Sequence, residues 1–332
     1  MKTRNYLSVI SWCLFVIVLG AGCSSDYSPA EVSHPNADVP VPISVQGASI
    51  GVELSTRAAS AITSGSMGVY LGSANDYTPK YNAQYTCSGG KWSSSSPINV
   101  VGKAATLYAY YPYNSGLGTS VGNPPISLSA QPYSADKEFC FAHSPVETSV
   151  KNTSPSVSFK MNHAYARLQF VITRNNSGND AYDSGPCKVS RIELAPASGS
   201  IFTSGRLDIT KSLSIGTSSP NPSLSGGVSK YTITTSGSLA TSGISAGGTD
   251  SSLDYLFPPQ QFSSALNLTV VVDGYTLTAA IPSASLSALS AGVHTQLKIN
   301  LQSLKIDVSV STAEIDSDYS SGGDLSGDIE VK

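Results

Sequence analysis

Charged side chains are scarce in this chain. They make up 12% of its 332 residues, about half of the ~25% that is usual in globular domains. The formal net charge is −3, from 19 basic and 22 acidic residues. Because a surface that binds nucleic acid needs clustered Lys and Arg, we expect no nucleic-acid partner. Hydrophobic residues at 40% are too many for a chain that is disordered throughout.

Motifs that carry catalysis or bind metals are also lacking. Only four histidines occur, and there is no Gly-x-Ser-x-Gly elbow, no Gly-Lys-Ser phosphate loop and no His-Glu-x-x-His motif. The carboxylates gather near the C-terminus, where Asp316 and Asp318 lack the Gly and the distant Glu of an EF-hand loop. We therefore expect no enzyme activity, no cofactor and no metal site.

Cysteine is too rare for a disulfide scaffold. Cys13 and Cys23 lie in an N-terminal targeting segment, so Cys87, Cys140 and Cys187 can form at most one disulfide and leave one thiol over. Their spacing fits no metal-ligand pattern. The simpler expectation is that the three thiols are buried and pack as small hydrophobic groups.

Long apolar runs are absent, except for one near the N-terminus. It extends from Tyr6 to Leu19 after Lys2 and Arg4, and it is shorter than the ~20 residues of a transmembrane helix. A charged start, an apolar run of this length and the small residues that follow it are typical of a secretory signal peptide. We therefore predict that the protein is exported.

Cys23 follows the small residues Gly20-Ala21-Gly22 directly. A cysteine in this place resembles a bacterial lipoprotein signal, in which the thiol receives lipid, palmitate included, and the cut falls just before it. We predict a signal peptide over 1–22, lipidation of Cys23 and a Ser- and Pro-rich tether over 23–40. The alternative is an ordinary secretory signal with a chance cysteine.

Short runs of alternating apolar and polar residues fill most of the chain, which is typical of β-strands. Residues 266–272 and 275–281 are examples, and Asp273-Gly274 between them predicts a hairpin, because a type I′ turn needs positive φ twice. No segment keeps a helical period over three turns. We therefore predict an all-β fold of sandwiches or barrels.

Chain length favours two domains, at about 100–200 residues each. A Ser- and Pro-containing stretch at 145–156 predicts the boundary. We expect an N-terminal β-sandwich domain over 41–152, a C-terminal one over 153–303, and a C-terminal strand or extension over 304–332.

Five short motifs follow Cys23 along the chain. They are Ser55-Thr56-Arg57-Ala58, MGVYL at 67–71, LYAYYPY at 107–113, FKMNHAYARL at 159–168 and LFPPQ at 256–260. In this order and spacing they resemble the fimbrillins, the subunits of type V pili, which are made as outer-membrane lipoprotein precursors. Relatives often end in Ile-x-x-Trp, whereas here Ile315 is followed by Tyr319, so the resemblance says less about the C-terminal mechanism.

The resemblance implies an all-β fold of two transthyretin-like antiparallel β-sandwich domains in series. It also implies a structural subunit of a cell-surface pilus, or fimbria, that supports adhesion. The lipidated precursor would reach the outer membrane, where an Arg-specific protease would remove the first strand. The C-terminal extension of another pilin subunit would then fill the groove by donor-strand exchange.

Particular residues match these implied steps. The alternating strand 43–54 is followed by Arg57 and Ala58 among small residues, which suit a cleavable loop; the alternative is that Arg57 is an ordinary solvated loop residue. Alternation also marks Leu304, Ile306, Val308 and Val310 as a candidate donor strand, unless these residues form the last strand of their own sandwich. A second, shorter candidate within 304–332 contains Leu325, Ile329 and Val331.

Two other roles remain open from the sequence. One is a monomeric outer-membrane lipoprotein that binds a glycan or another host ligand through aromatic stretches such as 108–113. The other is a tip or anchor subunit of the same pilus, and an anchor would be expected to escape cleavage at the arginine.

Overall fold

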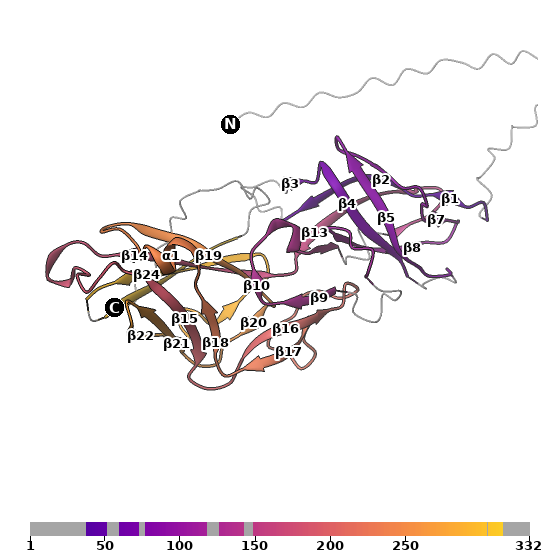
Figure 1. Cartoon of the computed structure of the whole chain (residues 1–332). Helices are drawn as coiled ribbons and strands as arrows, with labels where there is room; N and C mark the ends of the chain where they lie inside the picture. The colour runs from indigo at the N-terminus through magenta and orange to yellow at the C-terminus, as the bar shows by residue number, and fades with distance from the viewer. Residues whose placement is uncertain are drawn as a thin grey trace, which may run out of the picture.

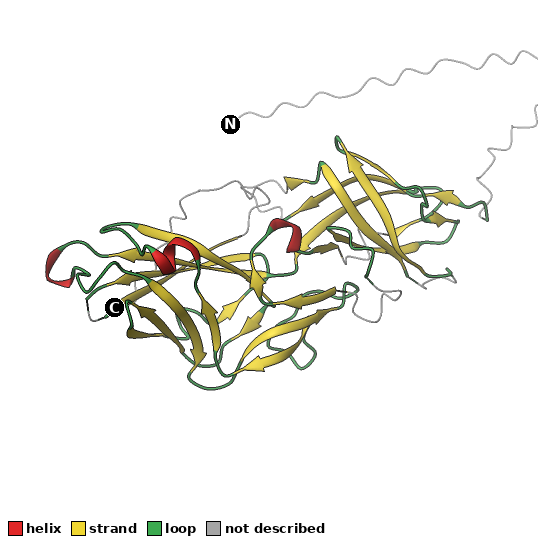
Figure 2. Cartoon of the chain, in the orientation of Figure 1, coloured by secondary structure: helices red, strands yellow, loops and turns green. Residues whose placement is uncertain are grey.

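The chain folds almost entirely into β-strands. The computed structural model describes residues 38–51, 60–72, 77–117, 126–142, 149–303 and 305–314. Within these residues the only α-helix is α1 (Gly237–Thr241), beside two short 3-10 helices, η2 (Ala135–Lys137) and η3 (Gly178–Asp180). Figures 1 and 2 show the strands gathered into two adjoining groups along the chain. The all-β prediction is confirmed.

The N-terminal group is built around one large mixed sheet. Its strands lie in the order β3 (Ser60–Ala61), β2 (Ser44–Ile50), β13 (Ser156–His163), β11 (Cys140–Ala142), β8 (Ala105–Tyr111), β4 (Ser64–Leu71), β5 (Lys80–Ser88) and β6 (Lys91–Ser93), and β12 (Ser149–Val150) also pairs with β8. A separate pair joins β1 (Val41–Pro42) to β7 (Asn99–Val100).

The C-terminal group contains several smaller sheets. The five-stranded sheet has the order β10 (Gln131–Pro132), β19 (Thr249–Phe257), β14 (Ala166–Arg174), β24 (Val293–Leu301) and β25 (Ile306–Glu314). The four-stranded sheet has the order β18 (Tyr231–Thr234), β15 (Val189–Pro196), β21 (Leu266–Val272) and β22 (Tyr275–Ile281). Smaller sheets join β17 (Ser223–Val228), β16 (Ile201–Leu207) and β9 (Ile126–Ser129), and β20 (Gln260–Gln261) with β23 (Ala288–Leu289).

The predicted hairpin at Asp273-Gly274 is confirmed. Val272 pairs with Tyr275, and the two turn residues have φ of +48° and +85°. The Asp273 carboxylate also accepts hydrogen bonds from the Cys187 and Lys188 amides at 2.7 and 2.9 Å. The turn residue therefore sets the hairpin and ties it to the segment that precedes β15.

Three clusters of buried side chains form the core. One belongs to the N-terminal sheet and includes Met67 and Phe159, and the largest belongs to the C-terminal sheets and includes Phe170 and Leu297. The third contains Tyr110 and residues of both groups, and it lies where they meet. That each half is a transthyretin-like sandwich stays a prediction.

The division between the sheets differs from the predicted boundary after residue 152. β13 belongs to the N-terminal sheet, while the earlier strands β9 and β10 pair with C-terminal strands β16 and β19. Turn composition marks loops, but it carries no information on which distant strand a segment will pair with. The last passage of the chain between the two groups is at 164–165, between β13 and β14.

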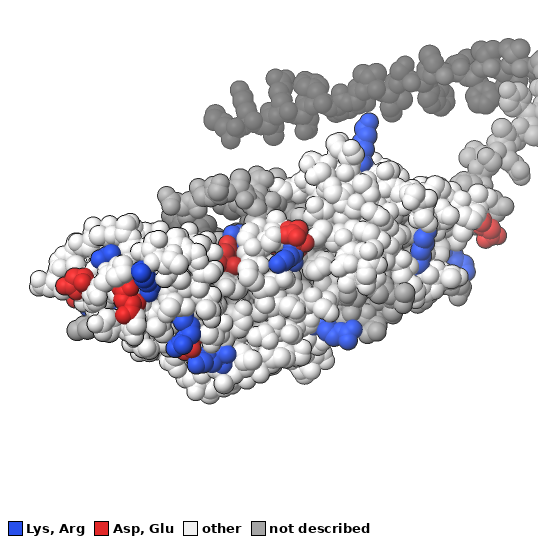
Figure 3. All heavy atoms as spheres, in the orientation of Figure 1, with Lys and Arg blue, Asp and Glu red and all other residues white. Residues whose placement is uncertain are grey.

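The low share of charged residues is visible on the surface of the protein. Lys, Arg, Asp and Glu are thinly scattered over the face shown in Figure 3.

Cys87, Cys140 and Cys187 are buried and free, as expected of thiols that pack as small hydrophobic groups. Among the described residues, no helix has the length and apolar character needed to cross a membrane.

Candidate functional site

The candidate site is the first long strand, β2, with the strand that it lies against, β13. β2 runs parallel to β13, with Ser44 opposite Ser156 and Ile50 opposite Met161. On its other side β2 pairs antiparallel with only the two residues of β3. Most of the backbone pairing of β2 is therefore with one neighbour.

Apolar side chains anchor this segment in the N-terminal core. Ile43, Val45 and Ala48 are buried, and Ile50 packs against the same cluster, whereas Gln46 is exposed. A register shift opposite Val157 and Ser158 explains why the buried positions in β2 are three apart and not two. The sequence predicted a strand over 43–54; the structure describes one over Ser44–Ile50, and 52–54 lie outside the described residues.

Backbone hydrogen bonds hold both ends of β2. The Ile43 amide donates to the Ile98 carbonyl at 2.9 Å and the Ser44 amide to Pro155 at 2.8 Å, while at the far end the Gly51 amide donates to Met161 at 3.0 Å. Without this segment, backbone groups of β13 would lose their partners, and an unpaired edge readily accepts another strand.

The predicted processing residues lie outside the described residues. Arg57 and Ala58 fall within 52–59, between Gly51 and Ser60. The flanking strands form a pair, with Ser49 opposite Ala61 and Ile50 opposite Ser60, so the described structure places the ends of this connection side by side. Cys23, the predicted lipidation residue, precedes the described residues.

The candidate donor residues are paired within their own sheet. Ile306, Val308 and Val310 lie in β25, which runs antiparallel to β24 from Leu301 opposite Ile306 to Val293 opposite Glu314. Ile306 and Val310 are buried and Val308 is half-buried. This is the arrangement expected of a last strand of the C-terminal domain; Leu304 lies outside the described residues.

Two parallel pairings in the structure were missed by sequence reasoning. β2 runs parallel to β13, and β24 runs parallel to β14 with Arg167 opposite His294. In each case an antiparallel strand follows on the outer side, β3 beside β2 and β25 beside β24. A two-residue period gives no strand direction, so no sequence signal could have revealed these pairings.

His163, at the end of β13, is a packed histidine. It is 4% exposed, its Nδ1 lies 2.5 Å from Glu138 Oε1, and Cys140 Sγ lies 3.6 Å away. Burial, with a smaller effect of Glu138, raises the pKa of the Cys140 thiol well above its ordinary value. No group of three His, Cys, Asp or Glu side chains that could hold a metal ion is found among the described residues.

A family model described as fimbrillin-like matches residues 47–316. The chain belongs to the fimbrillin-like family. The match begins within β2 and ends just after β25, so it takes in both groups of strands of this fimbrillin-like protein. A comparison with curated proteins found no match.

Crystal structures similar to this fimbrillin-like chain come from Bacteroides and Parabacteroides species. A candidate cell adhesion protein from Bacteroides uniformis is 16% identical, with 82% of this chain and 99% of that chain covered, at a TM-score of 0.55. One from Bacteroides ovatus is 16% identical (84% and 98% covered, TM-score 0.48), and a fimbrial protein from Bacteroides vulgatus is 14% identical (82% and 99%, TM-score 0.43). The likeness to the first indicates a shared fold.

Proposed function

We propose that this protein is a structural subunit of a cell-surface pilus that supports adhesion and works with other pilin subunits, without catalysis. In the proposal, Cys23 carries lipid that holds the precursor at the outer membrane. An Arg-specific protease then cuts between Arg57 and Ala58, and the shortened subunit joins a fimbria by donor-strand exchange. The observation that carries the proposal is the pairing of β2 with β13, because such a cut would detach β2.

The geometry of β2 favours exchange over simple loss. Its departure would uncover the backbone edge of β13 and the apolar positions now filled by Val45 and Ala48. An edge with open apolar pockets binds an extended segment through main-chain hydrogen bonds, and alternate side chains fill the pockets. A donor strand from a second copy of this chain has the required chemistry.

The donor segment is expected within 304–332 of the incoming subunit. Because β25 already completes a nine-residue ladder with β24, we favour the part after it, where Leu325, Ile329 and Val331 supply apolar side chains. Ile306, Val308 and Val310 would then stay in their own sheet and hold the base of the extension. A subunit lacking 315–332 should be cut normally and fail to polymerise.

Cleavage can be tested on the purified lipoprotein with an Arg-specific protease. The wild type should yield a new N-terminus at Ala58 and a ladder of polymers on a denaturing gel run without heating. Arg57→Ala should keep its original N-terminus and stay monomeric. Arg206→Ala, a matched change at an exposed arginine within strand β16, should behave as the wild type. Polymerisation of Arg57→Ala at the wild-type rate would contradict the processing step.

A further inference from the structure

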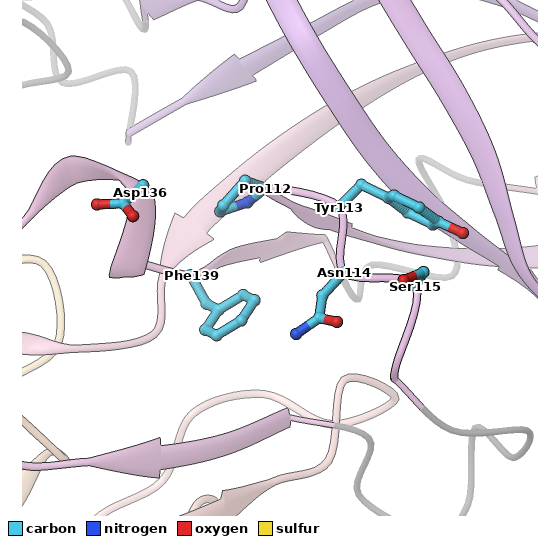
Figure 4. A pocket seen from close by; sticks show the side chains of 6 residues that line it. All are labelled: Pro112, Tyr113, Asn114, Ser115, Asp136 and Phe139. Carbon is cyan, nitrogen blue, oxygen red and sulfur yellow. The ribbon is translucent and has the colours of Figure 1, made fainter.

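A small open hollow lies beside the end of β8. Its volume is about 320 Å³, near the lower end of the roughly 300–1,000 Å³ of small-molecule pockets. The lining residues come from the turn after β8 and from the segment around η2: Pro112, Tyr113, Asn114, Ser115, Asp136 and Phe139. Figure 4 shows Phe139, Pro112 and Asn114 around its middle, with Asp136 to one side and Ser115 to the other.

Strand pairing brings these two segments together. β8 pairs with β11, so that Tyr111 lies opposite Cys140. Residues 112–115 continue from one strand and residues 136–139 lead into the other, and the hollow lies between them. About twenty residues separate the two segments in the sequence, so no local motif predicts the site.

Buried side chains hold the turn side of the hollow in place. The Tyr110 hydroxyl, on a fully buried ring, accepts a hydrogen bond from the Asn114 amide at 3.0 Å. Asn82 Nδ2 donates to the carbonyls of Asn114 and Leu117 at 3.0 and 3.1 Å. The turn side of the hollow is therefore held by the fold itself, which lowers the entropic cost of binding.

Among the described residues, the polar side chains around the hollow keep hydrogen-bonding atoms that have no partner. Asn114 Oδ1 accepts from the Gly116 amide at 2.9 Å, so Nδ2 is left to donate. Asp136 Oδ1 accepts from Ser134 Oγ, which leaves Oδ2 to accept. That hydrogen bond lowers the pKa of Asp136, and the carboxylate is ionised at neutral pH. Asn114 thus lies beside the half-buried ring of Phe139, with Asp136 to one side and Ser115 to the other (Figure 4).

This set of groups selects the chemistry of a ligand. The described residues that line the hollow include no lysine or arginine, and Asp136 repels anions, which disfavours phosphates and acidic sugars. A single carboxylate is a poor cation site, and three polar side chains disfavour a purely apolar ligand. A neutral sugar ring has one apolar face for Phe139 and hydroxyl groups for Asp136 and Asn114.

We propose that this hollow binds a neutral pyranose unit of a glycan, with Phe139 as the stacking surface and Asp136 and Asn114 as hydrogen-bonding partners. The inference goes beyond the proposed pilus function, because the hollow is part of one folded subunit and is separate from β2, β13 and β25. It gives the fimbria a way to adhere along its length.

Saturation-transfer NMR on the full chain tests the proposal with a panel of neutral methyl pyranosides. At least one should give a signal. Asp136→Asn should weaken that binding at least tenfold, and Ser115→Trp, which places a large ring at an exposed position in the hollow, should abolish it. Asp180→Asn, a matched change at an exposed aspartate of the other 3-10 helix, η3, should leave binding unchanged.

The opposite results would overturn the proposal. These are no signal from any neutral pyranoside, binding that survives both Asp136→Asn and Ser115→Trp, or binding of acidic sugars alone. Equal melting temperatures of the variants would show that they fold normally. Because Ser115→Trp leaves Arg57 and the donor segment intact, it should still polymerise, so failure of glycan binding is distinguishable from failure of the pilus function.

Discussion

His294, near the start of β24, is a histidine that the fold keeps neutral. Its Nε2 is buried and has no hydrogen-bond partner among the described residues. Burial first, and then the charge of Arg167 on β14, lower its pKa to about 4, although Asp254 on β19 opposes this shift. On the other side, β25 places the uncharged Ala313 opposite it. Protonation of His294 therefore works against the folded state.

The pH dependence of stability follows from this lowered pKa. In the unfolded chain the pKa of a histidine is about 6.5, so between pH 6.5 and about 4 the unfolded state binds more protons than the folded state. The free energy of unfolding should therefore fall as the pH falls through this window. When urea unfolding is measured at a series of pH values, the free energy of unfolding should fall less steeply with falling pH for His294→Gln than for the wild type. Equal slopes would contradict the assignment to this residue.

At the scale of single elements, β2 depends on a few buried side chains and on one neighbour. Ala48 is 4% exposed and faces the core, whereas Gln46, two positions earlier, is exposed. The two positions therefore form a matched pair within one strand. A carboxylate at position 48 would be buried without a partner, whereas a carboxylate at position 46 would stay in solvent.

Ala48→Asp should loosen β2 from β13, whereas Gln46→Asp should not. An unpaired buried carboxylate costs several kcal/mol, and this cost acts first on the contact between the two strands. Amide hydrogen exchange should accelerate in β13 for Ala48→Asp and stay at the wild-type rate in β21, which lies in another sheet. Equal exchange in β13 for both variants would show that β2 does not protect it.

How much the sequence could predict differs between elements. The hairpin at Asp273-Gly274 was predictable, because its strands adjoin in the chain and its turn needs particular residues. The parallel pairings of β2 with β13 and of β24 with β14 were not, because they join distant segments and depend on the whole sheet. The candidate site divides in the same way. Cys23 and Arg57 are predictions from sequence motifs and lie outside the described residues, whereas the pairing of β2 with β13 and the hollow at Phe139 arise only on folding.

At the scale of the whole molecule, the two groups of strands share a buried junction. Tyr165 lies in the two-residue connection between β13 and β14 and is 1% exposed. Its hydroxyl accepts hydrogen bonds from the Ser129 amide at 3.0 Å and from Gln131 Nε2 at 3.3 Å. Nearby, Arg167 forms an ion pair with Asp254 at 2.6 Å and stacks over Tyr133. Packing and polar contacts together should make the two groups unfold as one unit.

Tyr165→Ala should separate the unfolding of the two groups. Removing a large buried aromatic side chain costs about 3–5 kcal/mol, and here the lost contacts connect the N-terminal and C-terminal strands. Scanning calorimetry should show one transition for the wild type and two for Tyr165→Ala. Tyr165→Phe keeps the ring, so it should retain one transition and lose only about 1 kcal/mol. A single transition in Tyr165→Ala would mean that the junction does not couple them.

The direct passage from β13 to β14 has a mechanical consequence. Only residues 164 and 165 separate the strand beside β2 from a strand that lies between β19 and β24. In a polymer of the proposed kind, tension from a donor strand on β13 would load its ladder of hydrogen bonds in shear, many at once. The load would then pass along nearly continuous backbone into the C-terminal sheet. A fimbria built in this way would resist stretching without depending on loops to carry the force.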